Sequence, residues 1–204
     1  MTKEETVTFT SDGFEIESRL ASGDKPIGVA VSHPHPLYGG NMHNNVVTAV
    51  CRAYQEIGAT TLRFNFRGVG GSRGRYADGI GEQADVRAAV KFLADMDLQQ
   101  TELAGYSFGA WVNALAVTDG LKVDNMIMVS PPVAFIDFES IADLNSLKLV
   151  VTGNRDEIAP AEMVEKMYPA WNPRASFEVI DGADHFYGGC EQKLEEILIR
   201  NLKS

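Results

Sequence analysis

The stretch from Glu102 to Leu115 reads Glu-Leu-Ala-Gly-Tyr-Ser-Phe-Gly-Ala-Trp-Val-Asn-Ala-Leu, and the fold is decided here. Apolar residues lead into Gly105-Tyr106-Ser107-Phe108-Gly109, and a helix-like segment follows directly. A strand, a sharp turn and a helix are the context in which a G-x-S-x-G sequence presents its serine as a nucleophile. The flanking glycines are expected because strand and helix backbones pack closely at such a turn. Ser107 is therefore the candidate nucleophile, at a helix N-terminus that favours negative charge.

Outward from this turn, short apolar runs alternate with amphipathic segments. The predicted buried strands are Ile27 to Ser32, Thr60 to Phe66, Glu102 to Tyr106, Asn125 to Val129, Lys148 to Thr152 and Phe177 to Ile180. The predicted helices are about Asn44 to Ile57, Gly81 to Ala94, Phe108 to Val117, Ala161 to Tyr168 and Glu191 to Leu202. This alternation predicts an α/β fold with a doubly wound, mostly parallel sheet and helices on both faces.

The first residues follow a different pattern. Val7 to Thr10 and Phe14 to Leu20 alternate apolar and polar residues around Ser11-Asp12-Gly13. This pattern predicts an antiparallel N-terminal hairpin of two half-exposed strands.

Composition limits the class of protein. The chain has 204 residues, is 45% hydrophobic, and contains no repeat or long linker, which predicts a single domain over residues 1–204. A net charge of -10 disfavours nucleic acid and anionic membrane surfaces as partners. Without an apolar signal segment or a run of about 20 apolar residues, the expected location is cytoplasmic, with no membrane contact. Cys51 and Cys190 show no metal-ligand or redox spacing.

A serine nucleophile of this kind needs an acid and then a base on loops after later strands. Asp156 lies in the loop Asn154 to Pro160, after the apolar run Leu147 to Gly153, where it could accept a hydrogen bond from an imidazole. Glu157 is a rival acid at the next position. Asp156 is favoured because its shorter side chain would orient the base more stiffly.

The candidate base is His185, in the loop Asp181 to Gly189 after the apolar run Ser176 to Ile180. It is the only histidine after residue 43, and it occurs where the base of such a site belongs. The neighbouring Asp184 is expected to organise the turn, because adjacent side chains diverge in an extended loop.

Acyl transfer also requires two backbone N–H groups that face the developing oxyanion. Phe108, directly after the candidate nucleophile, is expected to supply one. The other is expected in the loop His33-Pro34-His35-Pro36-Leu37-Tyr38-Gly39-Gly40, after the strand that ends at Ser32. Proline has no N–H, so His35 and Leu37 are the two alternatives.

The elbow, the loop His33 to Gly40, and the segments Asn65 to Ser72, Gly153 to Asp156 and Gly182 to His185 together resemble a small α/β-hydrolase. The resemblance covers nearly the whole chain, which is similar to compact bacterial serine esterases related to dienelactone hydrolases. It implies the α/β-hydrolase fold and ester or thioester cleavage through an acyl-enzyme, without a metal or organic cofactor. Serine replaces the cysteine nucleophile of true dienelactone hydrolases, which argues against dienelactone chemistry.

Two competing interpretations involve other motifs. Gly68-Val69-Gly70-Gly71-Ser72-Arg73 resembles a dinucleotide-binding fingerprint, but Arg73 stands where the last glycine belongs. His33, His35 and His43 could in principle bind a metal, yet no nearby carboxylate or cysteine completes a ligand set, and a structural loop is the better interpretation.

The expected mechanism is attack by Ser107 on an acyl carbonyl, with His185 as base and Asp156 holding the imidazole. The interval Ser130 to Leu147 is too short for the cap domain that many larger hydrolases carry, which predicts an open site for small or flexible acyl groups. Its expected walls are Leu37, Tyr38, Tyr106, Phe108, Phe135 and Phe186, although each could equally be core packing.

Two alternatives remain at this stage. A peptidase or amidase could use the same triad, because only the pocket discriminates between acyl substrates. A catalytically weak hydrolase fold could serve as a small-molecule binding protein, against which the complete Ser, Asp and His set argues. No pattern in the sequence identifies the acyl group or the oligomeric state.

Overall fold

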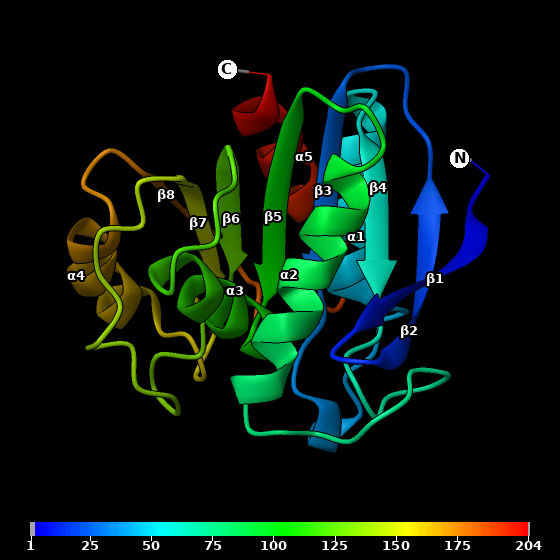
Figure 1. The fold of residues 1–204 in the computed structure, drawn as a ribbon. Coiled ribbons are helices and arrows are strands. Elements are labelled where there is room, and N and C mark those ends of the chain that lie inside the picture. The colour runs from blue at the N-terminus through cyan, green and yellow to red at the C-terminus, as the bar shows by residue number, and fades with distance from the viewer. Residues whose placement is uncertain (1–2, 204) are drawn as a thin grey trace.

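A computed structural model describes residues 3–203 and arranges its strands in one eight-stranded sheet (Figure 1). The strands are β1 (Glu5–Ser11), β2 (Phe14–Ala21), β3 (Ile27–Ser32), β4 (Thr60–Phe64), β5 (Gln100–Tyr106), β6 (Asn125–Val129), β7 (Leu147–Gly153) and β8 (Ser176–Ile180). The helices are α1 (Asn45–Glu56), α2 (Ile80–Ala94), α3 (Phe108–Thr118), α4 (Ala161–Trp171) and α5 (Glu191–Leu202), with a short 3-10 helix, η1, at Pro36–Tyr38. No helix within the described range is both long and apolar enough to cross a membrane.

The strand order in the sheet is β1-β2-β4-β3-β5-β6-β7-β8. β2 pairs antiparallel with β1 and β4, and every other pairing is parallel. Asp12 and Gly13, at the tip of the β1–β2 hairpin, both have positive φ, as a tight two-residue turn requires. The predicted parallel sheet with an antiparallel N-terminal hairpin is therefore confirmed.

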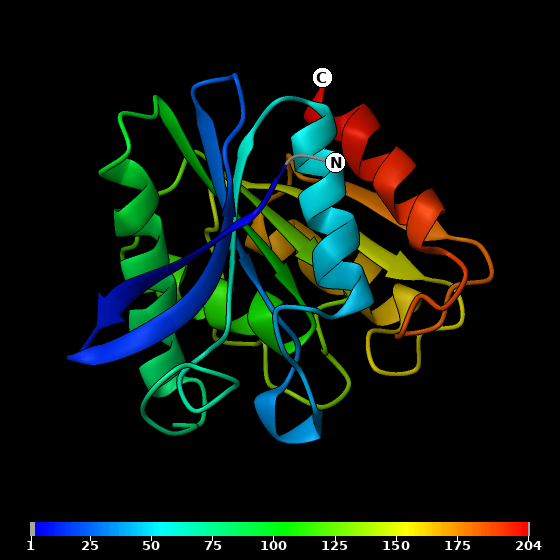
Figure 2. The same ribbon diagram turned by 90° about the vertical axis from the view of Figure 1, so that its right-hand side faces the viewer.

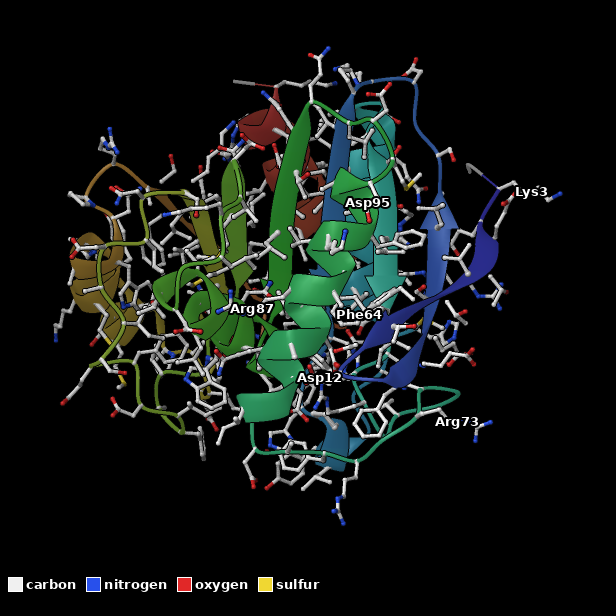
Figure 3. The ribbon with its side chains drawn as sticks, in the orientation of Figure 1. Lys3, Asp12, Phe64, Arg73, Arg87 and Asp95 are labelled. Atoms are coloured by element: carbon white, nitrogen blue, oxygen red, sulfur yellow. The ribbon has the colours of Figure 1, made fainter. Side chains whose placement is uncertain are left out.

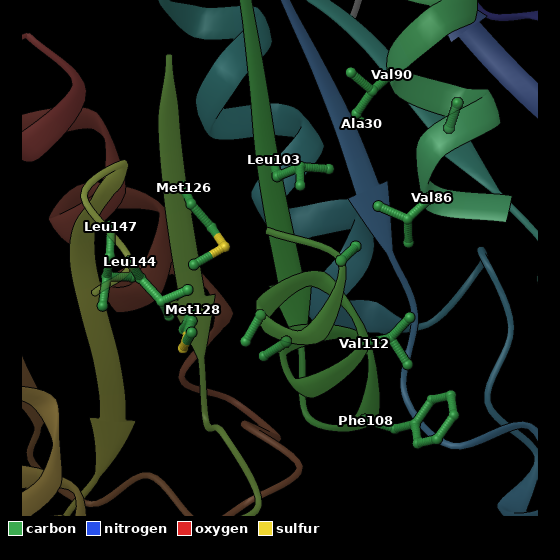
Figure 4. Packing of buried hydrophobic residues seen from close by; sticks show 14 of the residues in the cluster. Ala30, Val86, Val90, Leu103, Phe108, Val112, Met126, Met128, Leu144 and Leu147 are labelled. Carbon is green, nitrogen blue, oxygen red and sulfur yellow. The ribbon is translucent and has the colours of Figure 1, made fainter. Parts of the chain in front are cut away.

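The sheet separates two hydrophobic clusters, because successive side chains of a strand point to opposite faces. Ala30 of β3 belongs to the cluster on one face, and Val29 and Val31 belong to the cluster on the other. Helices α2, α3 and α4 cover the first face, and α1 and α5 cover the second (Figures 1 and 2). Figure 4 shows Val86 of α2 and Val112 of α3 within the first cluster.

Most elements begin or end within one or two residues of the sequence expectation, and β4 and α4 differ for a visible reason. β4 ends at Phe64 rather than Phe66, because the Phe66 N–H leaves the strand ladder and donates to the His33 ring. α4 continues beyond Tyr168 to Trp171, although Pro169 lies within it. The buried Trp171 ring packs against Phe138, with ring centroids 5.3 Å apart, and this contact favours the additional turn.

The carboxyl ends of the parallel strands meet at the lower edge of the sheet in Figure 1, where η1 and the loops after β4, β6, β7 and β8 also lie. Figure 3 shows Arg73 of the β4–α2 loop pointing into solvent at this edge, whereas Phe64 at the end of β4 points into the core. Ligand sites in open parallel sheets form at this edge.

Candidate active site

Ser107 occupies the turn between β5 and α3, with φ 55° and ψ -122°. This backbone conformation is unfavourable for a residue with a side chain, and the surrounding hydrogen bonds maintain it. The Ser107 N–H donates to the Val129 carbonyl at 2.9 Å, and the Ser107 carbonyl accepts from the Ala110 N–H at 2.9 Å. The serine hydroxyl is thereby presented at the N-terminus of α3.

The glycines on either side of this turn are required by close backbone contacts. A Cβ on Gly105 would lie 2.6 Å from the Ala110 nitrogen, and a Cβ on Gly109 would lie 2.6 Å from the Ser32 carbonyl oxygen. Neither backbone atom can move aside cheaply. The expectation that the turn packs strand and helix too closely for side chains is confirmed.

The loops after β7 and β8 bring Asp156 and His185 to Ser107. His185 Nε2 lies 2.9 Å from Ser107 Oγ, and His185 Nδ1 lies 3.0 Å from both carboxylate oxygens of Asp156. All three side chains are largely buried. The strands β5, β7 and β8 end at one sheet edge, so three residues far apart in sequence form one continuous set of contacts.

The rival carboxylates lie outside this set. Within residues 3–203, Glu157 is exposed and makes no hydrogen bond or ion pair with His185, whereas Asp156 is 4% exposed and does both. Asp184 Oδ1 accepts the backbone N–H groups of Phe186 and Tyr187, at 3.0 and 3.1 Å. Asp184 therefore organises the turn after His185, as expected from the sequence.

Asp156 is held as a carboxylate by several donors. Its Oδ1 accepts the N–H groups of Ile158 and Ala159 at 2.9 and 2.7 Å, and its Oδ2 accepts the Ser130 hydroxyl at 2.6 Å. Burial by itself would raise the pKa of Asp156, but the hydrogen bond and charge of His185, together with the Ser130 and Ala159 hydrogen bonds, lower that pKa below its ordinary value.

Two buried tyrosines support the loops that carry Asp156 and His185, a role that the sequence did not reveal. The Tyr106 hydroxyl donates to the His185 carbonyl oxygen at 2.7 Å. The Tyr187 hydroxyl lies 2.8 Å from Ser130 Oγ. Tyr106 was expected in a pocket wall, but its side chain is only 2% exposed and lies in the core cluster under α1 and α5. This placement does not fit a wall residue.

The other expected wall residues, apart from Phe108, are strongly exposed. The exposed fractions are Leu37 67%, Tyr38 88%, Phe135 74% and Phe186 66%, and Ile80 at 77% joins them at this sheet edge. Phe108 is instead buried at 1%. Ile80 could not be recognised from the sequence, because its position in the first turn of α2 is that of an ordinary helix start.

The loop before η1 distinguishes the two N–H groups considered for the oxyanion. The Leu37 N–H donates to the His35 ring at Nδ1, 3.2 Å away. The His35 N–H makes no hydrogen bond within residues 3–203. The His35 ring lies against Phe108, with centroids 4.7 Å apart, and its Nε2 is 3.2 Å from the Tyr76 hydroxyl. His35 is therefore adjacent to the residue that follows Ser107.

His33 ties this loop to the end of β4. Its Nε2 accepts the Phe66 N–H at 3.0 Å, so Nδ1 carries the proton and donates to the Pro34 carbonyl at 2.6 Å. Burial lowers the pKa of His33 to about 4, against the opposing effect of the Pro34 hydrogen bond. His33 is thus neutral in the folded protein at neutral pH.

Neutral, buried His33 makes the stability of the protein depend on pH. Below pH 6.5 the unfolded chain gains a proton that the folded chain does not accept until about pH 4, so stability falls across this window as the pH falls. The expected contribution is about 3 kcal/mol. Urea denaturation at pH 7 and pH 4.5 should show His33→Gln, whose amide oxygen can still accept the Phe66 N–H, losing less stability on acidification than the wild type. An equal loss in both proteins would contradict this role.

The loop after β4 is built on buried polar contacts rather than on a nucleotide-binding geometry. The Arg67 guanidinium pairs with the buried Asp85 at 2.8 Å and with Asp12 at 3.1 Å. The Asn65 side chain accepts the Met42 N–H and donates to Glu17. The Gly71 N–H donates to the Glu17 carboxylate and the Arg73 N–H to the Glu15 carbonyl, and these contacts join the glycine-rich segment from Gly68 to Arg73 to the hairpin.

The three histidines considered for a metal do not converge. The ring nitrogens of His33 and His35 take part in the hydrogen bonds given above, and His43 is exposed. Within residues 3–203, no three His, Cys, Asp or Glu side chains are grouped as a metal ion would require.

No family model matches the chain. An uncharacterised protein from Rickettsia prowazekii is 35% identical over 193 residues, which cover 89% of this chain and 81% of that protein. A solved α/β serine hydrolase homologue from Coxiella burnetii is 38% identical, with a TM-score of 0.91, covering 99% of this chain and 98% of the other. A serine hydrolase without a lid from Xanthomonas campestris is 30% identical, with a TM-score of 0.90, covering 100% and 95%. With β6 and β7 joined by a loop too short for a lid domain, the chain belongs to the lidless α/β serine hydrolases.

Proposed function

We propose that this hydrolase cleaves small carboxylic ester or thioester substrates through an acyl-enzyme on Ser107. The observation that carries the proposal is the continuous contact from Ser107 Oγ to His185 Nε2, at 2.9 Å, and from His185 Nδ1 to Asp156, at 3.0 Å. A serine hydroxyl is a weak nucleophile unless an adjacent base removes its proton, and this contact supplies such a base.

The reaction proceeds in two halves. Ser107 Oγ attacks the acyl carbonyl carbon while His185 Nε2 takes the hydroxyl proton, and the same proton then passes to the departing alcohol or thiol. Water attacks the acyl-enzyme in the second half, again with His185 as base. Asp156 keeps the ring proton on Nδ1 and stabilises the imidazolium.

The oxyanion of each tetrahedral intermediate is held by the N–H groups of Phe108 and His35. Phe108 opens α3, and the first N–H groups of a helix have no partner within it. Between the two alternatives in the preceding loop, His35 is favoured because the Leu37 N–H is already donated to the His35 ring. The proximity of the His35 and Phe108 rings supports the pairing.

The substrate is a small molecule that enters from solvent over an apolar rim. The exposed rim residues include Tyr38, Ile80, Phe135 and Phe186, which lie in the segments that follow β3, β4, β6 and β8. Apolar side chains around a polar reaction centre suit an acyl group of limited size.

A fluorophosphonate probe tests the proposal. We expect one label per protein molecule, located on Ser107 by peptide mass spectrometry, because the probe reacts with a serine that a neighbouring base activates. Ser107→Ala should abolish labelling, and His185→Ala should slow it at least a thousandfold. A folded wild-type protein that takes up no label contradicts the proposal.

Matched p-nitrophenyl esters, thioesters and p-nitroanilides of the same acyl group then separate the reaction classes. Turnover of the ester and thioester but not of the anilide is expected. Anilide cleavage at a comparable rate would assign an amidase instead.

A further inference from the structure

Backbone strain in the described residues is concentrated at the proposed active site. Seven non-glycine residues within 3–203 have positive φ. Four of them are the aspartates at 12, 78, 97 and 143, a residue type that tolerates the left-handed region. The other three are Ser107, Ser130 and Tyr187, with φ of 55°, 46° and 57°. All three lie in the site described above, where strain must be maintained by surrounding contacts.

Ser130 and Tyr187 form a directed hydrogen-bond chain to the acid. Ser130 Oγ is 2.6 Å from Asp156 Oδ2, and an ionised carboxylate can only accept, so the serine proton points to Asp156. Ser130 Oγ therefore accepts from the Tyr187 hydroxyl, 2.8 Å away. Both side chains are fully buried, which prevents water from replacing either bond.

Ser130 is the side-chain donor to Asp156 besides His185. Thr152 Oγ1 is 3.4 Å from Asp156 Oδ2, but it is 2.7 Å from the Ala159 carbonyl, and its single proton goes to the nearer acceptor. Without Ser130, Asp156 Oδ2 would keep only its half of the shared bond to His185 Nδ1.

Glycine would adopt the backbone conformation of residues 130 and 187 with less strain. Glycine would supply neither the Ser130 hydroxyl nor the Tyr187 hydroxyl, however, so the strained residues provide hydrogen-bonding groups that a less strained glycine could not. That contribution is the chain that ends on Asp156 Oδ2.

We propose that Ser130 and Tyr187 are positioning residues, which hold the carboxylate of Asp156 against His185 Nδ1 and limit its attraction for the ring proton. This inference rests on the proposed function of the Ser107, His185 and Asp156 set. Both side chains are fully buried, out of reach of a molecule that enters from solvent, so their effect is exerted through Asp156.

The titratable groups that face Asp156 are His185, Tyr187 and Tyr106. Burial raises the pKa of both tyrosines well above the range of an activity assay. If removal of the Ser130 or Tyr187 hydroxyl changes how kcat/KM falls at low pH, that change therefore reports on the Asp156–His185 pair.

The test uses Ser130→Gly and Tyr187→Phe, which remove a hydroxyl without adding bulk. We expect kcat for a p-nitrophenyl ester to fall about tenfold to a hundredfold, the effect of losing a hydrogen bond to a buried charge, with KM unchanged. A carboxylate with fewer donors stabilises the protonated His185 ring more, so the acidic limb of kcat/KM should move to higher pH. The Nδ1 proton of His185 should also resonate further downfield in the proton NMR spectrum.

Tyr54→Phe is the matched control. Tyr54 is also fully buried and donates to a carboxylate, Glu102, at 2.8 Å, but it lies away from the site. It should cost comparable thermal stability and leave both the pH profile and the NMR signal unchanged. Should Ser130→Gly fold poorly, Tyr187→Phe alone carries the test, because it removes the Tyr187 hydroxyl and leaves the backbone of both residues unchanged.

The inference would be overturned if folded Ser130→Gly and Tyr187→Phe kept the wild-type kcat and the wild-type dependence of kcat/KM on low pH. It would also be overturned if the loss of activity only matched the loss of folded protein. These outcomes are distinct from failure of the proposed function. In that case Ser107→Ala would retain the activity of the wild type.

Discussion

Replacing Asp156 by asparagine is expected to lower kcat about ten-thousandfold while KM changes little. The asparagine carbonyl should take the place of Oδ1, which accepts the Ile158 and Ala159 N–H groups. Its NH2 group would then replace Oδ2 and donate toward His185 Nδ1. The ring would keep its proton on Nε2, where it can no longer accept the Ser107 proton. Steady-state kinetics with a p-nitrophenyl ester measures the loss.

The control for this variant is Glu157→Gln. Glu157 is the neighbouring carboxylate, and it is exposed to solvent. Its neutralisation should change kcat less than twofold, an effect typical of a surface charge. A large loss in Glu157→Gln with nearly normal activity in Asp156→Asn would reverse the assignment of the acid.

The second large effect is expected at Gly153, where β7 ends and the loop that carries Asp156 begins. A Cβ there would lie 2.1 Å from the Ala183 carbonyl oxygen, in the loop that carries His185. Gly153→Ala should therefore push the two loops apart and lower the free energy of unfolding by about 4 kcal/mol or more. Urea denaturation measures the stability. The folded fraction should also turn over ester more slowly, because Asp156 and His185 lie on the separated loops.

Gly188→Ala is the matched control, since Gly188 lies in the base loop with no atom within 4 Å of its added Cβ and no positive φ. It should change the free energy of unfolding by less than about 1 kcal/mol. If Gly153→Ala were as stable and active as Gly188→Ala, the two loops would not depend on close approach.

The fold could be predicted because its signals are local. Strand-length apolar runs such as Ile27 to Ser32 and amphipathic helices such as Glu191 to Leu202 specify α/β alternation within short windows. Element ends were less predictable, because they depend on distant partners. Phe66 leaves β4 for the ring of His33, which is 33 positions earlier.

The candidate residues Ser107, Asp156 and His185 could also be predicted from the sequence, because each lies in a loop directly after an apolar run. The structure brings their side chains into contact. Tyr106 was misplaced for a physical reason. Its neighbour Ser107 faces the site, whereas the Tyr106 side chain points into the core under α1 and α5. There its hydroxyl donates to the His185 carbonyl oxygen.

By itself, the amino-acid sequence determined the alternation of strands and helices and the loop in which each reacting group lies. The periodicity of apolar residues and the placement of glycines are set within a few neighbouring residues, so both can be recognised in the sequence alone. Only the tertiary structure decided that Ser130 donates to Asp156 and accepts from Tyr187, and that the Leu37 N–H donates to the His35 ring. It also decided that Gly153 packs against Ala183. These contacts join residues on different loops, and their distances depend on how the whole sheet brings its strand ends together.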